Sequence, residues 1–224
     1  MHSNMEKKYI FLAGMHRAGS TLLTSILNQN PSIFASSSSP VCNVLYWSNR
    51  LWSDQIALQA NPNPMAVQAV LGSMIPSFYS TRPEQIIIDK GFNWGVPENL
   101  SFLTNALGYV PKFIVMDRPV NEVFDSYNEL LAKSPDFVGN IHGFMEGMVL
   151  SHDNLLKEIP EQCFVVNYKR LCNDTQGLLN EFYGFIDEPI YSHDLSYIVN
   201  TNTDNDKVWG LIDMHEIRPT IGEK

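Results

Sequence analysis

The residues most suited to chemistry lie in one short loop. Residues 14–21 read GMHRAGST and nearly match the phosphate-binding pattern G-x-x-x-x-G-K-[ST], except that Ser20 replaces the lysine. Arg17 supplies a cation from within the loop. Backbone N–H groups of such a loop, together with the positive end of a following helix, bind phosphate or sulfate. The loop therefore predicts an anion site, and the missing lysine disfavours a nucleoside triphosphate with magnesium. A turn with only a structural role is the alternative.

A second group of polar residues lies about 100 residues later, in the stretch DRPVNEVFDSY. Arg118 ends a predicted strand, and Ser126 lies two helical turns into the segment that follows. Two turns return a residue to the same helix face, roughly 10 Å further along, so Arg118 and Ser126 are expected to share one phosphate. In the alternative, Arg118 pairs on a solvated face with an acidic neighbour: Asp117, Glu122 or Asp125.

The elements that must position these residues follow from hydrophobic patterning. Apolar strands are predicted at residues 9–14, 32–36, 85–90, 112–117 and 163–168. Helices are predicted at residues 19–29, 97–107, 119–132 and 137–156, with a last helix beginning near Asp174. This alternation predicts an α/β fold in three layers, P-loop-like, with a central parallel sheet of about five strands and helices on both faces. Ligands of such sheets bind at the carboxyl ends of the strands.

Two further segments depart from this alternation. Helices at residues 43–58 and 65–79, separated by the turn-forming NPNP at 61–64, form a predicted helical insertion over about residues 43–80. The stretch from about 191 to 224 is polar and is expected to be a loop.

Length and composition limit the kind of protein. A chain of 224 residues suits one domain over residues 1–224. A net charge of −9 argues against a nucleic-acid binder. No apolar run near the N-terminus is long enough to span a membrane. The three cysteines lack metal-ligand spacing and suit reduced thiols, so we expect a cytoplasmic protein without a metal.

Together the two motifs resemble the sulfotransferase family, which uses 3′-phosphoadenosine 5′-phosphosulfate (PAPS) as its donor. In that family the motif P-[KR]-[SA]-G-[ST]-T cradles the 5′-phosphosulfate, and residues 16–21 read HRAGST here. The arginine is most similar to the protein-tyrosine branch. The resemblance implies that the 5′-phosphosulfate is held by Arg17, Ala18, Gly19, Ser20 and Thr21. It also implies that Arg118 and Ser126 hold the 3′-phosphate.

The resemblance covers most of residues 9–186. The stretch IIIDKGFNW looks like the family's strand that ends in a lysine near the transferred sulfate, here Lys90. The stretch CFVVNYKRL is similar to a late segment of the family and implies a nucleotide contact by Tyr168. The polar tail resembles the family's cofactor-covering loop, so Lys207 is expected to reach the 3′-phosphate.

Some positions depart from the family pattern. Pro119 follows Arg118 directly, Asn121 replaces a frequent arginine, and Lys169 stands where an acidic residue is common. The protein-tyrosine branch has a glutamate that acts as base about twenty residues after the loop arginine, where this chain reads ASSSSPV.

These residues suggest roles in an in-line transfer, in which positioning and fixed positive charge do most of the work. Arg17 is expected to stabilise the leaving phosphate, and Lys90 the sulfate oxygens, unless Lys90 is simply an exposed lysine after a strand. His16 and Asp89 are the candidate bases. In the alternatives, His16 packs or donates to the ligand, and Asp89 forms a salt bridge with Lys90.

The predicted function is sulfuryl transfer from PAPS to an acceptor hydroxyl of a small molecule, sugar or peptide, with no metal, nucleic acid or membrane involved. One alternative is a non-catalytic module that binds the nucleotide but lacks the base. The other is a P-loop kinase-like enzyme, in which the strand ending at Asp89 would bind magnesium. The sequence does not predict the oligomeric state.

Overall fold

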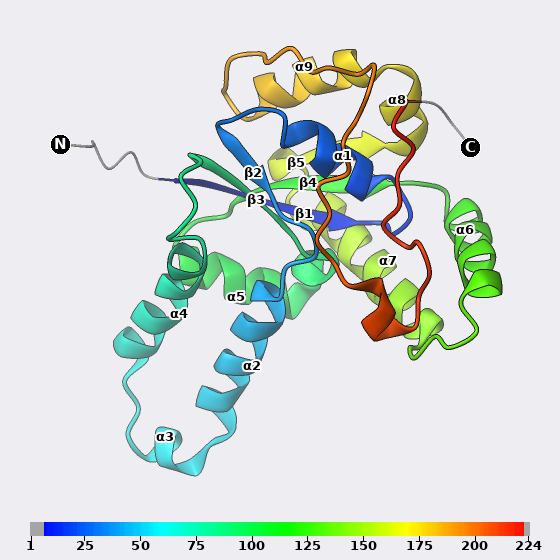
Figure 1. Cartoon of the computed structure of the whole chain (residues 1–224). Helices are drawn as coiled ribbons and strands as arrows, with labels where there is room; N and C mark the ends of the chain where they lie inside the picture. The colour runs from blue at the N-terminus through cyan, green and yellow to red at the C-terminus, as the bar shows by residue number, and fades with distance from the viewer. Residues whose placement is uncertain (1–6, 222–224) are drawn as a thin grey trace.

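The computed structural model describes residues 7–221 and has a five-stranded parallel sheet at its centre (Figure 1). The strands are β1 (Lys8–Gly14), β2 (Ile33–Ala35), β3 (Ile86–Lys90), β4 (Lys112–Asp117) and β5 (Cys163–Asn167). They lie in the order β2-β3-β1-β4-β5, and every neighbouring pair is parallel. The predicted P-loop-like α/β fold is confirmed.

Helices cover both faces of the sheet, as Figure 1 shows. One face carries α1 (Ser20–Leu27), α6 (Val120–Lys133), α8 (Tyr168–Asn173) and α9 (Thr175–Phe185). The other carries α2 (Val41–Asp54), α4 (Pro64–Phe78), α5 (Pro97–Leu107) and part of α7 (Ile141–Glu158). The remaining short helices are α3 (Ile56–Ala60), η1 (Phe92–Gly95), η2 (Pro160–Gln162) and η3 (Asp206–Trp209). Within residues 7–221, none of the helices combines the length and the apolar character that crossing a membrane requires.

The alternation of side chains along the strands divides the core into two halves. On β1, Ile10 and Leu12 pack towards α1 and α9, whereas Phe11 and Ala13 pack towards α2 and α5. Successive side chains of a strand point to opposite faces. The same rule on β3 sends two adjacent polar residues, Asp89 and Lys90, to opposite sides of the sheet.

The helical insertion differs from its prediction in one detail. The first predicted helix, 43–58, is two helices, because Gln55 adopts an extended conformation between α2 and α3. The NPNP turn acts as expected. The side chain of Asn63 caps α4 by accepting from the backbone N–H of Ala66, and Pro64 occupies the first helical turn, where no N–H partner is needed.

The tail after α9 crosses the carboxyl ends of the strands, turns at η3 and comes back alongside itself (Figure 1). The two passes are joined by Ile198 N, which donates to Pro219 O, and by the Asn200 amide, which donates to His215 O. The expected loop at 191–224 is thus fixed in place as far as residue 221. Residues 1–6 and 222–224, which the one-domain expectation includes, lie outside the described part of the chain.

Asp89 does not lie beside Lys90. Its carboxylate, 1% exposed, accepts hydrogen bonds from Tyr79 Oη (2.5 Å), Ser39 Oγ (2.6 Å) and Trp94 Nε1 (2.7 Å) beneath α2 and α4. Burial raises the pKa of Asp89, and the three donors oppose that rise. The geometry therefore separates Asp89 from the phosphate-binding loop. The proposed salt bridge to Lys90 is absent from the described contacts, and the carboxylate instead joins three segments of the core.

We expect Asp89→Ala to lower the free energy of unfolding by about 2–4 kcal/mol, because it leaves three buried donors without an acceptor. Asp89→Asn keeps an acceptor and should cost less. Urea denaturation monitored by circular dichroism measures both. Asp54→Ala, at an exposed ion pair with Arg50, is the matched control and should cost about 1 kcal/mol or less. A fully stable Asp89→Ala protein would contradict this role.

Candidate functional site

The phosphate-binding loop joins β1 to α1 and is pressed against β4. Gly14 has a φ of 97°, and a Cβ there would lie 2.5 Å from Met116 O. Met15 N donates to the same carbonyl at 2.8 Å. Only glycine suits this conformation and this close approach. The contact places the loop next to the carboxyl end of β4, which Arg118 follows directly.

Arg17 connects the loop to two distant segments. Its backbone has a φ of 56°, its Nε donates to Ser126 Oγ (3.1 Å) on α6, and its Nη1 donates to Met214 O (2.5 Å) in the tail. Burial lowers the pKa of Arg17, with a further contribution from Arg118. The loop arginine and the serine of the second motif are thus in direct contact.

Arg118 approaches the loop but is held by other partners. Its Nη1 donates to Arg17 O (2.6 Å), its Nε donates to Glu122 Oε2 (3.2 Å), and its guanidinium lies 4.2 Å from the centre of the Tyr168 ring. The pairing with Glu122 is therefore observed. The expected neighbourhood of Arg118 and Ser126 arises through Arg17, which contacts both.

Tyr168 is packed against the start of α1. Gly19, the N-cap of α1, has a φ of 84°, and a Cβ there would lie 3.0 Å from the Tyr168 ring. The first turn of α1 carries no acidic residue and no side-chain cap. Its backbone donors and its positive end therefore face the loop uncompensated by a carboxylate.

A cavity of about 540 Å³ opens beside the loop, within the range of small-molecule sites. Eight of the predicted residues line it: His16, Arg17, Gly19, Ser20, Thr21, Arg118, Ser126 and Tyr168. Ala18 and Lys90 are buried and are not among the lining residues. Residues 212–220 of the tail, which was expected to cover the site, form a further wall. Lys133, two turns after Ser126 on α6, also lines the cavity and was not predicted.

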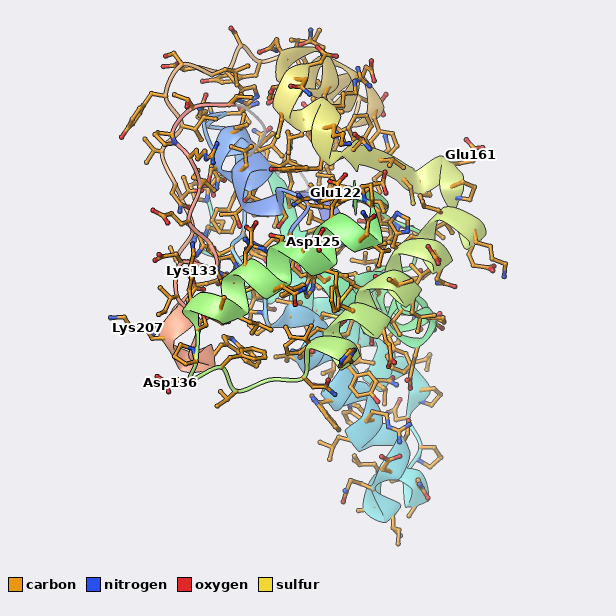
Figure 2. The ribbon with its side chains drawn as sticks, turned by 90° about the vertical axis from the view of Figure 1, so that its right-hand side faces the viewer. Glu122, Asp125, Lys133, Asp136, Glu161 and Lys207 are labelled. Atoms are coloured by element: carbon orange, nitrogen blue, oxygen red, sulfur yellow. The ribbon has the colours of Figure 1, made fainter. Side chains whose placement is uncertain are left out.

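Lys207 lies outside this cavity. It belongs to η3, is exposed, and points outward at the edge of the tail in Figure 2. Lys133, labelled on α6 in the same view, lines the cavity instead. The tail covers the site as expected, but with residues after η3 rather than with η3 itself.

Lys90 is buried without a partner. Its side chain is on the α1 side of the sheet, the residue is 1% exposed, and Nζ has no hydrogen-bond partner among the described residues. Burial lowers the pKa of Lys90 to about 8, while Asp204 and Asp206 act in the opposite direction. The alternative of an exposed lysine is wrong. A buried ammonium without a partner is costly, and an anion would remove that cost.

His16 lies between the loop and α6. Its Nδ1 is 2.5 Å from Tyr127 Oη, and its ring centre is 3.9 Å from that of Phe92. The pKa of His16 falls to about 3, mainly through burial and then through the charges of Lys90, Arg17 and His215. The imidazole is therefore neutral at physiological pH.

The serine run at 36–39 is fixed to the tail. Ser38 donates to Asp204 through its backbone N–H (3.1 Å) and through Oγ (2.8 Å). His215 then contacts Asp206 through Nδ1 (2.5 Å) and Asp204 through Nε2 (3.3 Å). This cluster of Asp204, Asp206 and His215 was not predicted from the sequence. The pattern DND followed by a histidine was the available signal, but only the fold brings it to the serines.

No group of three or more histidine, cysteine, aspartate or glutamate side chains in residues 7–221 has an arrangement suited to a metal ion. The three cysteines, Cys42, Cys163 and Cys172, are free thiols.

Comparison with known proteins gives one consistent family. Residues 9–192 match the family model described as "Sulfotransferase family". A comparison with curated protein sequences gave no match.

Solved structures show the same fold at low identity. A sulfotransferase domain from the curacin biosynthetic pathway has a TM-score of 0.57 at 18% identity, covering 93% of this chain and 84% of that one. A sulfotransferase domain from the olefin synthase of Synechococcus PCC 7002 has a TM-score of 0.56 at 19% identity, covering 87% and 81%. A sulfotransferase from Alicyclobacillus acidocaldarius has a TM-score of 0.57 at 13% identity, covering 91% and 89%.

Because its ammonium is buried and unpartnered, replacing Lys90 should stabilise the protein while weakening anion binding. Lowering the lysine pKa from 10.5 to about 8 corresponds to about 3 kcal/mol of lost stability at pH 7. The native state binds fewer protons than the unfolded state between those values, so wild-type stability rises with pH across that window. Lys90→Met should therefore raise the melting temperature at pH 7, with the difference shrinking towards pH 10.5.

Thermal unfolding with and without inorganic sulfate tests this. Sulfate should raise the melting temperature of the wild type more than that of Lys90→Met. Lys157→Met, at an exposed lysine of α7, is the control and should change neither quantity appreciably. Equal protection of wild type and Lys90→Met by sulfate would rule out Lys90 as an anion ligand.

Proposed function

Since this chain belongs to the sulfotransferase family, we propose that it transfers a sulfuryl group from PAPS to the hydroxyl of an acceptor. The observation that carries the proposal is the buried, unpartnered ammonium of Lys90, whose charge acts on His16 of the arginine-bearing loop. An arrangement with two cations and free helix donors suits the phosphosulfate end of the nucleotide.

The donor residues around the cavity fit both ends of this nucleotide. Gly19, Ser20 and Thr21 offer the N-terminal donors of α1 to the 5′-phosphate. Arg118 and Ser126 line the same cavity and are proposed for the 3′-phosphate. Ser126 currently accepts from Arg17, so this assignment requires Arg17 to exchange that contact for the leaving phosphate.

The proposed reaction needs little from the protein beyond positioning and charge. The acceptor oxygen forms a bond to sulfur as the bond from sulfur to the bridging oxygen breaks. The electron pair of that bond stays with the nucleotide phosphate, and the acceptor proton passes to a base or to solvent. Arg17 stabilises the leaving phosphate, and Lys90 stabilises the sulfuryl oxygens. The acceptor class, whether small molecule, sugar or peptide, remains part of the proposal, as does a cytoplasmic location.

One observation favours a second function, a module that binds the nucleotide without turning it over. The family's base position is occupied by the serine run, and Ser37, Ser38 and Ser39 all make contacts that fix the loop. A kinase-like function is the weaker alternative, because the loop has Ser20 in place of the lysine that precedes the Ser/Thr of the phosphate-binding pattern.

We expect Arg118→Ala to weaken binding of adenosine 3′,5′-bisphosphate by about 10- to 100-fold, since one charge-assisted hydrogen bond is worth about 1.5–3 kcal/mol. Binding of adenosine 5′-monophosphate, which lacks the 3′-phosphate, should change by less than about threefold. Calorimetric titration measures both ligands. Arg50→Ala, at an exposed arginine of α2, is the control. Loss of affinity for both ligands alike would refute the 3′-phosphate assignment.

Transfer of labelled sulfate from PAPS to a panel of phenols, sugars and peptides separates the enzyme from the binding module. The wild type should label at least one acceptor class, and Arg17→Ala should lower the rate by about 10²- to 10³-fold. Nucleotide binding without any transfer would favour the module. Magnesium-dependent protection by ATP, with none by the bisphosphate, would instead favour the kinase-like alternative.

A further inference from the structure

His16 occupies a central place in the site, and its environment restricts what it can do. It lines the cavity beside Arg17, its ring packs on Phe92, and one ring nitrogen is committed to Tyr127 on α6. The backbone N–H of His16 donates to Met148 Sδ of α7 at 3.1 Å. The residue is thus held from three elements, and none of its described hydrogen bonds uses the second ring nitrogen, Nε2.

The direction of the hydrogen bond between Nδ1 and Tyr127 decides which ring nitrogen carries the hydrogen. Tyr127 is 2% exposed, and burial raises the pKa of its phenol, so its O–H stays protonated. A neutral imidazole has one donor nitrogen and one acceptor nitrogen. If the Tyr127 O–H donates to Nδ1, then Nε2 carries the hydrogen.

We propose that His16 is an uncharged hydrogen-bond donor, through Nε2–H, to an oxygen of the phosphosulfate, and that Tyr127 is the positioning residue that fixes this tautomer. The inference rests on the proposed sulfuryl transfer and assigns a role to the one loop residue that the anion motif does not explain. It replaces the alternative in which His16 acts as the general base.

The charges around His16 favour a donor over a base. Lys90 from β3, Arg17 from the loop and His215 from the tail each lower the proton affinity of the ring. Accepting a proton would place a further positive charge among them. A neutral N–H donor adds no such repulsion, and it strengthens as negative charge builds on the departing oxygens. Neutral imidazoles of lowered pKa serve as electrophiles in other enzymes for the same reason.

Nuclear magnetic resonance of protein labelled with ¹⁵N-histidine tests the tautomer directly. The signal that disappears in His16→Gln belongs to His16, and His142→Gln provides an exposed histidine of α7 for comparison. We expect a neutral Nε2–H tautomer from pH 5.5 to 8, both free and with adenosine 3′,5′-bisphosphate. Tyr127→Phe should mix the two tautomers. An imidazolium or an Nδ1–H tautomer in the wild type would overturn the proposal.

A rate comparison tests the role in transfer, with water as the acceptor so that no acceptor need be known. His16→Gln retains a side-chain N–H and should keep the rate of PAPS hydrolysis within about tenfold of the wild type. His16→Ala should lose about 10²-fold or more. Equal losses in both variants, with a changed pH profile, would identify a base instead.

These outcomes separate the two proposals. If the wild type fails to bind adenosine 3′,5′-bisphosphate and fails to turn over PAPS, the proposed function fails whatever the histidine does. If it binds the nucleotide but His16 is protonated or in the other tautomer, only the donor role fails. Circular dichroism of Tyr127→Phe and His142→Gln checks that each variant folds.

Discussion

The site depends on positive charge that the fold holds in place without a compensating anion. Lys90 is buried with no hydrogen-bond partner, and the pKa of Arg17 is lowered by burial and by Arg118. Such an arrangement costs stability in the free protein. It persists because the parallel sheet fixes the end of β3 beside the end of β1, and because Gly14 lets the loop lie directly on β4. An anion in contact with these cations would recover part of that cost.

Most of the fold could be predicted from the sequence because its signals are local. Continuous apolar runs alternating with helices identified all five strands and the helices between them. The extra helices α3 and α8 were missed because each begins directly after a single extended residue, Gln55 and Asn167 respectively. The helix predicted at 43–58 is two helices, and the strand predicted at 163–168 ends at Asn167. Both errors concern the bounds of elements and leave the architecture unchanged.

The candidate site could be predicted only where polar residues lie at the carboxyl ends of predicted strands. Arg17 and Arg118 follow strands and Lys90 ends one, so the topology brings them to the same edge of the sheet. Of the three, Arg17 and Arg118 line the cavity. Asp89 shows the limit of this reasoning, since moving one residue along a strand reverses the face. The tail shows another limit. Asp204 contacts Ser38, which lies 166 residues earlier in the chain. His215 contacts Asp204 and lines the cavity. No local sequence pattern contains such long-range contacts.

Under the proposed function, Arg17 connects nucleotide binding to the tail. In the free protein its guanidinium is satisfied by two neutral acceptors, Ser126 Oγ and Met214 O. Hydrogen bonds that involve a charged group contribute about 1.5–3 kcal/mol each, and a charged acceptor adds to the charge of the guanidinium donor. A phosphate oxygen is therefore a better acceptor for this guanidinium than either neutral oxygen. Displacing Ser126 frees a hydroxyl for the second phosphate, whereas displacing Met214 frees the segment that covers the cavity. Under the proposed function, release of Ser126 would prepare the nucleotide site and release of Met214 would loosen its cover. Arg17 would then link binding at the loop to access for the acceptor.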